Sequence, residues 1–462
     1  MSDSVAAIIL AAGKGTRMKS ELPKGLHAVG GVPMVGHVGS ALRAAGADPV
    51  IVVVGHGGEL LQEALGQDYQ YAWQREQLGT GHAAKMASPL LKDHHGPVII
   101  APGDAPLVTP ELFQRLLKAH RDGQGLCTVA STRLEDPTGY GRIVRDGEHV
   151  ARIVEHKDAT EEERAIQEVA VSIFCFDAQA LLAALEEIKP NNAAGEYYLT
   201  DAVEIIRAQG GIIAGCLIPE SEWVMGVNDR WQLAAAETAL RTRILRRHAH
   251  AGVTILDPAT TYIGAEVEIA PDTVIEPNTF LAGRTRLLGP CHVGPFTRID
   301  ESTIGTGTRI TMSQVFRATI GERVHIGPFA NIRPESVVGN ESKIGNFVEL
   351  KKTTLERDVK VSHLTYLGDA SVGESTNIGA GTITCNYDGF EKHRTTIGPQ
   401  AFVGTNSTLV APVTIGPGAF TAAGSVITED VPGDALALGR SRQLNKEGWA
   451  AEWRRRKKSK TH

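Results

Sequence analysis

The first half of the chain alternates short apolar runs with amphipathic stretches. Apolar runs at 6–10, 50–54 and 98–101 are separated by segments in which apolar residues recur at helical spacing. This alternation of strands and helices is typical of an α/β domain whose sheet is largely parallel. The pattern therefore predicts such a domain up to about residue 220.

A segment without helix breakers follows this region. Residues 230–250 are rich in Ala, Leu, Arg and Glu and contain neither Pro nor Gly. That composition favours one continuous helix, which Gly252 ends. We expect this helix to connect two domains.

Beyond the helix, aliphatic residues recur every six positions. A period of six fits neither an α-helix nor a plain strand, but it suits a β-helix in which each hexapeptide forms one short strand and one turn. The predicted organisation is therefore a domain at 1–228, a linker helix at 229–250 and a β-helix at 251–462. The three aliphatic runs are Ile263, Ile269, Ile275, Leu281, Leu287, Val293 and Ile299; Ile320, Ile326, Ile332, Val338, Ile344 and Leu350; and Ile397, Val403, Leu409 and Ile415.

Composition supports two packed, turn-rich domains. The chain has 462 residues, of which 42% are hydrophobic and 50 are glycines, while aromatic residues make up only 5%. The net charge of -6 is mild and gives no sign of a nucleic-acid-binding surface. We expect the basic segment 454–458 to be a disordered, solubilising tail.

Cysteine usage and the N-terminus both point to a cytoplasmic protein. The five cysteines lie far apart without a CxxC pair, which argues against a disulfide framework and a zinc knuckle. The apolar run 5–12 follows Asp3 where a signal peptide needs positive charge, and no run approaches the length of a membrane span. We expect reduced thiols and no insertion into a membrane.

A glycine-containing loop follows the first predicted strand. Without Cβ atoms, Gly13 and Gly15 let backbone N–H groups converge on phosphate oxygens, and Arg17 and Lys24 can offset a triphosphate charge. Solvated surface charge is the ordinary alternative for two such cations, but the adjacent loop favours phosphate binding. No Walker A pattern can be aligned, and Met18 replaces the third glycine of GxGxxG, which disfavours kinases and dehydrogenases.

This loop resembles the signature of sugar nucleotidylyltransferases. Together the two halves are similar to the family of bifunctional UDP-N-acetylglucosamine pyrophosphorylases and glucosamine-1-phosphate N-acetyltransferases. The motifs 77–82, 136–142, 155–157 and 195–198 recur in the family's order, and the resemblance covers nearly the whole chain. It implies an α/β Rossmann-like nucleotidyltransferase domain joined by a long helix to a left-handed parallel β-helix domain.

The implied activity is the synthesis of UDP-N-acetylglucosamine. An acetyl group would pass from acetyl-CoA to glucosamine-1-phosphate. Uridylate would then pass from UTP to N-acetylglucosamine-1-phosphate in a Mg²⁺-dependent step that releases pyrophosphate. The family also implies a homotrimer with acyl-CoA bound between adjacent prisms, and a C-terminal arm that Trp449 and Trp453 would anchor.

The resemblance also assigns the nucleotide site. Asp104 and Asn228 would bind Mg²⁺, a cation that suits few protein ligands because it keeps water and phosphate in its shell; a helix-capping role for Asp104 is the alternative. The family has Asn where this chain has Ala170, so we expect one sugar hydrogen bond to be missing. UTP or UDP-sugar contacts are expected from Leu10, Ala11, Ala12, Gly13, Arg17, Lys24, Gln74, Gly79, Thr80, Gly103, Asp104, Gly141, Glu155 and Asn228, with Gln74, Gly79 and Thr80 at the uracil and Gly141 and Glu155 at the sugar.

In the β-helix, His363 matches the family's catalytic histidine. An imidazole, whose ordinary pKa is near 6.5, can accept a proton from an amine that attacks a thioester, although an isolated histidine is more often structural. The segment 385–389 interrupts the aliphatic register and is predicted to leave the prism as a loop. The implied sugar-phosphate contacts are Arg333, Lys351, Tyr366 and Asn377, and the implied acetyl-CoA contacts are Ala380, Asn386, Tyr387, Thr405, Ala423 and Arg440.

Two alternatives stay open at this point. The chain could be a nucleotidylyltransferase whose β-helix serves only assembly or regulation. It could also be a catalytically silent scaffold that binds ligands. The presence of His363 and Lys351 disfavours the first alternative, and Asp104 together with Asn228 and His363 disfavours the second.

Overall fold

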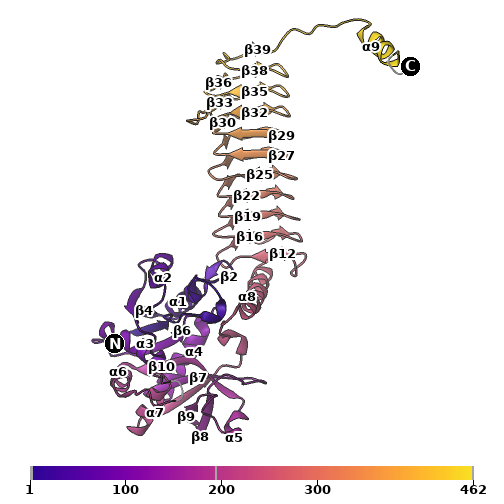
Figure 1. Cartoon of the computed structure of the whole chain (residues 1–462). Coiled ribbons are helices and arrows are strands. Elements are labelled where there is room, and N and C mark those ends of the chain that lie inside the picture. Colours follow the sequence, from indigo (N-terminus) through magenta and orange to yellow (C-terminus); the bar gives the residue numbers. More distant parts are fainter. Residues whose placement is uncertain (1–3, 193–194, 460–462) are drawn as a thin grey trace. The chain divides into compact units, whose positions relative to one another are not determined.

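The protein is described by a computed structural model that covers residues 4–192 and 195–459. The chain divides into two compact units, Met1–Ile244 and Leu245–His462 (Figure 1). Helix α8 (Arg230–His250) covers the residues for which a long helix is predicted, and it contains the boundary between the units. Gly252, with φ at +94°, follows its end.

The first unit is an α/β domain built on one twisted sheet. The strand order is β11-β7-β10-β6-β1-β4-β5, and β1 pairs in parallel with both β4 and β6, as the sequence predicts. Strand β10 runs antiparallel between β6 and β7, which the apolar pattern did not reveal. The strands of this sheet are β1 (Val5–Leu10), β4 (Ala47–Val54), β5 (Gln70–Trp73), β6 (Pro97–Pro102), β7 (Cys127–Arg133), β8 (Arg142–Asp146), β9 (His149–Val154), β10 (Glu168–Asp177) and β11 (Ile213–Leu217), while β2 (Ala28–Val29) and β3 (Val32–Pro33) pair with each other in a separate sheet.

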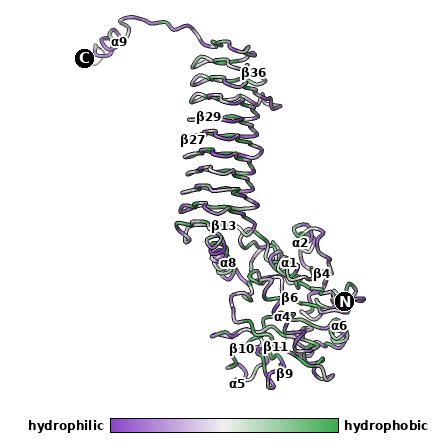
Figure 2. The backbone as a smooth tube through the Cα atoms, turned by 180° about the vertical axis from the view of Figure 1, so that it is seen from behind, coloured by the Kyte–Doolittle hydropathy of each residue, from purple (hydrophilic) through white to green (hydrophobic). Residues whose placement is uncertain are grey.

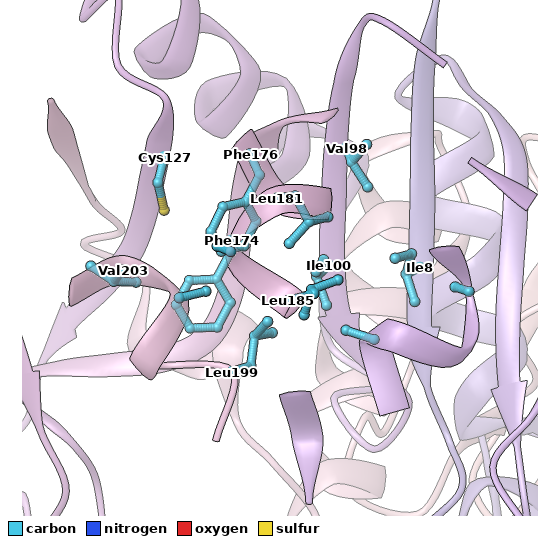
Figure 3. Packing of buried hydrophobic residues seen from close by; sticks show 14 of the residues in the cluster. Ile8, Val98, Ile100, Cys127, Phe174, Phe176, Leu181, Leu185, Leu199 and Val203 are labelled. Carbon is cyan, nitrogen blue, oxygen red and sulfur yellow. The ribbon is translucent and has the colours of Figure 1, made fainter. Parts of the chain in front are cut away.

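Helices cover both faces of this sheet and create two apolar cores. Successive side chains of a strand point to opposite faces, so Ile8 belongs to one core and Ile9 to the other. In the first core, Phe174 and Phe176 of β10 stack with ring centroids 5.7 Å apart (Figure 3). The helices are α1 (Met34–Ala44), α2 (Gly58–Leu65), α3 (Thr80–Met86), α4 (Pro110–Asp122), α5 (Glu161–Arg164), α6 (Ala178–Glu187) and α7 (Asp201–Ala208), with short 3₁₀ turns at η1 (Thr16–Met18), η2 (Lys24–Leu26), η3 (Ser88–Leu90) and η4 (Ser221–Val224).

The second unit is a parallel β-helix, as the six-residue period predicts. Short strands stack coil on coil in three columns, and Figure 2 shows hydrophobic and hydrophilic stretches alternating within the coils. In the first predicted aliphatic run every residue is buried except Ile269, which is half-buried. Two strands are longer and span the first and second columns, namely β27 (Lys343–Lys351) and β29 (Lys360–Gly368).

The remaining strands of the β-helix are two or three residues long. Besides β27 and β29, the first column contains β12 (Thr254–Ile255), β15 (Val274–Ile275), β18 (His292–Val293), β21 (Arg309–Ile310), β24 (His325–Ile326), β31 (Asn377–Ile378), β34 (Phe402–Val403), β37 (Phe420–Thr421) and β39 (Leu436–Ala437). The second contains β13 (Tyr262–Ile263), β16 (Phe280–Ala282), β19 (Arg298–Asp300), β22 (Gln314–Phe316), β25 (Asn331–Ile332), β32 (Ile383–Cys385), β35 (Thr408–Val410) and β38 (Val426–Ile427). The third contains β14 (Glu268–Ile269), β17 (Arg286–Leu287), β20 (Thr303–Ile304), β23 (Thr319–Ile320), β26 (Val337–Val338), β28 (Thr354–Leu355), β30 (Ala370–Val372), β33 (Thr395–Ile397) and β36 (Val413–Ile415).

One corner of the β-helix carries apolar side chains on its outside. We call Phe296, Met312, Phe329, Phe347 and Leu364 the apolar ridge; each has a positive φ between 42° and 62° at the corner between the first and second columns. Backbone hydrogen bonds connect successive coils at this corner; for example, the N–H of Phe347 donates to the Phe329 carbonyl oxygen at 3.1 Å. Phe329 and Phe347 also stack at 5.4 Å although both are exposed by more than half.

Two local predictions need correction. Cys385 still belongs to β32, so the chain leaves the prism only after it; strand pairing with β35 outweighs the missing aliphatic residue. The basic C-terminal segment is helical rather than disordered, because α9 (Trp449–Lys458) includes it and stacks Trp449 on Trp453 at 5.7 Å. Among the described residues, no helix combines the length and apolarity that a membrane crossing needs.

Candidate functional sites

A cavity of about 740 Å³ opens in the first unit at the ends of β1 and β6. All fourteen residues predicted for the nucleotide site line it, together with Ala170. Both strands are parallel and end at Leu10 and Pro102, and ligands of α/β domains bind beyond the carboxyl ends of such strands. The volume is within the usual range for a small-molecule site.

The glycine loop forms one wall of this cavity. Gly15 has φ at +58°, and a Cβ atom there would lie 2.7 Å from the Cβ of Lys24, so the loop needs glycine at this position. A Cβ at Gly13 would meet no atom within 4 Å, which leaves room for a ligand beside the backbone. Met18 is buried and anchors the loop instead of approaching a phosphate.

Four polar side chains meet at the predicted metal site. The Lys24 ammonium donates to the Asp104 carboxylate and, at 2.8 Å, to Asn228 Oδ1. Arg17 donates to the same Asn228 oxygen at 2.8 Å, and the Val227 N–H donates to the Asp104 carbonyl at 2.9 Å, which ties the two segments together. Asp104 does not cap a helix, since Thr109 caps α4.

This donor set fits a hard divalent cation. A carboxylate and an amide oxygen are ligands that Mg²⁺ accepts, and both already face a cation, the Lys24 ammonium. Within the described ranges 4–192 and 195–459, no three His, Cys, Asp or Glu side chains converge as a metal centre. An ion at Asp104 and Asn228 would therefore take its other ligands from water and phosphate.

Gln74 is 3% exposed and its amide orientation is fixed by two neighbours. Its Nε2 lies 3.0 Å from the Gly79 carbonyl oxygen, which can only accept, and 3.0 Å from His82 Nδ1. Both amide hydrogens are therefore used, and Oε1 remains as an acceptor for a base that carries a ring N–H, such as uracil. The sequence motif 77–82 includes His82, but nothing in its pattern indicated this contact.

The predicted sugar end of the cavity is acidic. Burial raises the pKa of Glu155, the neighbouring Asp158 raises it further, and a hydrogen bond with the Thr200 side chain opposes the shift. Gly141 faces Glu155, since a Cβ there would lie 3.6 Å from its carboxylate. Ala170 donates its N–H to the Gly141 carbonyl at 2.9 Å, but its methyl group offers no hydrogen bond to a ligand.

In the second unit, His363 lies beside Asn346. Strands β27 and β29 pair these two residues directly, and His363 Nδ1 is 2.8 Å from Asn346 Oδ1. An amide oxygen only accepts, so Nδ1 carries the proton and Nε2 of the neutral ring carries the lone pair. Asn346 belongs to no sequence motif; the register of the coils brings it to the histidine.

Cationic side chains gather at the corner that follows the second column. Arg333 pairs with Glu349 at 2.7 Å, and contact with Lys392 lowers the pKa of Lys351. Lys392 is a second ammonium group that the sequence motifs did not indicate. Neighbouring cations of this kind suit a phosphate ligand.

Tyr366 and Asn386 approach each other over Gly368. A Cβ on Gly368 would lie 2.3 Å from the Tyr366 hydroxyl oxygen and 2.8 Å from Asn386 Nδ2, so only glycine lets both side chains reach this place. Asn386 donates to the Asp369 carboxylate. Asn377 lies on β31 in the first column, where it pairs with Lys360, whereas Tyr366 pairs with Ile383 in the second column. The structure therefore places these two predicted sugar contacts in different columns.

Four of the six predicted acetyl-CoA residues, Ala380, Thr405, Ala423 and Arg440, lie in the coils that follow His363 along the corner between the first and second columns. The N–H of Gly381 donates to Leu364, that of Asn406 to Ala380, and that of Gly424 to Thr405, which places these coils in succession. Ala423 precedes Gly424, and the Arg440 side chain passes 3.8 Å from the position of a Cβ on Gly424. Tyr387, 60% exposed, projects from the loop that follows β32, so within one chain this surface is open.

Comparison with known proteins covers both units. Residues 7–196 match the model of a MobA-like NTP transferase domain, and residues 317–352 and 394–429 match the bacterial transferase hexapeptide (six repeats). The chain is 51% identical over 454 residues to the bifunctional protein GlmU of Geobacillus thermodenitrificans, covering 98% of this chain and 99% of that protein. The GlmU proteins of Caldanaerobacter subterraneus and Staphylococcus haemolyticus are 52% and 47% identical, over 97% and 96% of this chain and 98% of each relative.

The chain belongs to the GlmU family. The predicted family is thus confirmed, and so is the fold class, an α/β nucleotidyltransferase domain joined to a left-handed β-helix of hexapeptide repeats. The GlmU relatives are called bifunctional and match along both units. This full-length match favours the two-activity prediction over a β-helix that serves only assembly, and over a silent scaffold.

Proposed function

We propose that this member of the GlmU family makes UDP-N-acetylglucosamine in two steps. The β-helix acetylates glucosamine-1-phosphate with acetyl-CoA, and the α/β domain joins the product to uridylate from UTP. The observation that carries the proposal is the full-length match to bifunctional relatives, with a nucleotide-sized cavity in one unit and an Asn346-supported His363 in the other. Five free cysteines are in keeping with a cytoplasmic location.

In the uridylyl step, the residues of the cavity position two anions. Arg17 and Lys24 offset the charge of the triphosphate, while Gln74 accepts from the uracil N–H. A phosphate oxygen of the sugar phosphate attacks the α-phosphorus in line, and pyrophosphate leaves. Asp104 and Asn228 would hold Mg²⁺, which when bound supplies positive charge at the α-phosphate.

In the acetyl step, His363 acts as the base. Its Nε2 takes a proton from the amino group as that nitrogen attacks the thioester carbonyl, and the C–S bond breaks to release the coenzyme as a thiolate, which takes the proton back from the imidazolium to become the thiol. Lys351, with Lys392 beside it, would hold the sugar phosphate. Asn346 keeps the proton on Nδ1, so that the lone pair of Nε2 is available.

A homotrimer would complete the acetyl-transfer site. In one chain His363 and Tyr387 are exposed, so a neighbouring copy is needed to enclose the coenzyme. The apolar ridge is next to His363 and exposes Phe296, Phe329, Phe347 and Leu364 by 55–65%, which supports burial against another copy. The hexapeptide repeats also support self-association.

The proposal is tested by incubating the purified protein with glucosamine-1-phosphate, acetyl-CoA, UTP and Mg²⁺, with each omitted in turn. Products are identified by mass spectrometry. Omission of UTP should leave N-acetylglucosamine-1-phosphate, and omission of acetyl-CoA should leave the starting sugar phosphate. Absence of an acetylated product in the complete mixture would contradict the assignment of the β-helix.

Replacing Asn346 with Asp should shift the pH dependence of acetyl transfer. A carboxylate beside the ring stabilises the imidazolium, which raises the histidine pKa by about one unit or more. Because the neutral ring is the base, the rising limb of kcat should move to higher pH. The measurement is kcat for thiol release between pH 6 and 10, and Asn346→Ala should lower kcat without this alkaline shift. An unchanged profile in Asn346→Asp would mean that Asn346 does not act on the histidine.

Replacing Ala170 with Asn should strengthen sugar binding in the cavity. One added hydrogen bond contributes roughly 0.5–1.5 kcal/mol, so KM for N-acetylglucosamine-1-phosphate should fall by about twofold to tenfold. KM for UTP should stay the same because Ala170 is proposed to face only the sugar. Steady-state pyrophosphate release measures both constants, and a parallel change in both would argue against this placement.

A further inference from the structure

Lys24 occupies the position at which the proposed metal ligands meet. Its ammonium donates to the Asp104 carboxylate and, at 2.8 Å, to Asn228 Oδ1, the two atoms that would bind Mg²⁺. The Lys24 side chain is 16% exposed and that of Asp104 is 27% exposed, so water screens the pair only partly. Lys24 is therefore the counter-ion of this carboxylate.

An ammonium group and a divalent cation cannot share these two oxygens. Mg²⁺ requires contacts of about 2.0–2.1 Å to its ligands, which would place it almost in contact with the Lys24 nitrogen. Like charges at that separation repel strongly in a partly enclosed site. A bare divalent cation must therefore displace Lys24 before it can bind.

The triphosphate provides a new partner for the displaced ammonium group. The Lys24 stem runs along the glycine loop, since its Cβ, Cγ and Cδ atoms lie within 3.4 Å of a Cβ placed on Gly15. Lysine has a flexible stem and a compact charged head, so its head can turn while the stem stays in place. Phosphate oxygens at the loop would then replace the Asp104 carboxylate as its partner.

We propose that Lys24 controls entry to the metal site, and this rests on the proposed uridylyltransferase function. Without nucleotide, Lys24 holds Asp104 and Asn228 in place and makes free divalent cations bind weakly. The cation enters together with the triphosphate, whose negative charge draws the ammonium group away. Lys24 is thus a positioning residue for the metal ligands as well as a phosphate contact.

The test measures binding of Mn²⁺, used alone as a spectroscopic probe, to full-length protein by electron paramagnetic resonance. In the absence of UTP, Lys24→Met should bind Mn²⁺ at least about tenfold more tightly than the wild type, since the competing charge is gone. Lys24→Arg should retain weak binding. Adding UTP should strengthen Mn²⁺ binding in the wild type by more than it does in Lys24→Met.

Matched variants make the outcome decisive. Lys14 is exposed on the same loop, so Lys14→Met removes an equal charge and should leave Mn²⁺ affinity unchanged. Acetyl transfer by each variant reports that the other unit is intact, and thermal unfolding followed by circular dichroism reports that the α/β unit with the substitution is folded. Equal Mn²⁺ affinities of wild type and Lys24→Met without UTP would overturn the proposal. If Asp104→Ala binds Mn²⁺–UTP as well as the wild type does, the proposed metal site itself is wrong.

Discussion

Replacement of His363 with alanine should lower acetyl transfer to glucosamine-1-phosphate by about 10²–10⁴-fold, the range for loss of a general base. The attacking amine must lose its proton, and the Asn346 contact leaves Nε2 of His363 as the atom that accepts it. The fall should appear in kcat rather than in KM for acetyl-CoA, because the ring acts on the reacting nitrogen. Thiol release from acetyl-CoA gives both constants.

His325 provides a matched control for this experiment. It is an exposed histidine on β24 of the same β-helix, so His325→Ala removes an imidazole without touching the proposed site. Acetyl transfer should continue at the wild-type rate in His325→Ala, and uridylyl transfer should be normal in both variants. A wild-type rate in His363→Ala would show that another group takes the proton.

Replacement of Asp104 with alanine should impair uridylyl transfer and leave acetyl transfer unchanged. Uridylyl transfer should fall by about 10²–10³-fold, the effect of removing one preorganised electrostatic contact. The variant loses a proposed Mg²⁺ ligand and also leaves Lys24 without its carboxylate partner. Pyrophosphate release from UTP and N-acetylglucosamine-1-phosphate measures the loss, while thiol release should be unchanged.

Chelation and a second aspartate provide the controls. Removing divalent cations from the wild type should abolish pyrophosphate release and spare acetyl transfer. Asp122 on α4 pairs with Lys118 at the surface, so Asp122→Ala should leave both activities intact. Equal loss of both activities on chelation would contradict the assignment of the metal to the α/β domain alone.

Much of the fold follows from the spacing of apolar residues. The six-residue period predicts the β-helix because each short strand points one aliphatic side chain into the interior of the prism. In the first aliphatic run every such residue is buried except Ile269, which is half-buried. Strand direction does not follow from spacing. Strand β10 is as apolar as its neighbours and yet runs antiparallel to them. The apolar pattern of a strand reflects only its burial, which is the same for either strand direction.

Some residues of the candidate sites could be predicted from the sequence and others could not. The glycine loop and Asp104 stand in contiguous motifs, and a motif keeps its residues together in space when it follows a buried strand. Asn346 and Lys392 are in no motif that the sequence revealed. Asn346 reaches His363 through pairing between coils, and Lys392 reaches Lys351 through a loop whose path the sequence does not specify.

The loop after β32 shows how a stack of coils can acquire a new part. In the first column, Asn377 of β31 pairs with Phe402 of β34, and Phe402 pairs with Phe420 of β37. The first two residues are further apart in sequence than the second two, so the coil between β31 and β34 contains an insertion. The additional residues emerge sideways, and the coils above and below keep their register. Because each coil touches only its neighbours, an insertion at a corner costs little beyond closing the loop. Such a scaffold can gain or exchange reactive appendages over evolution while its interior stays the same.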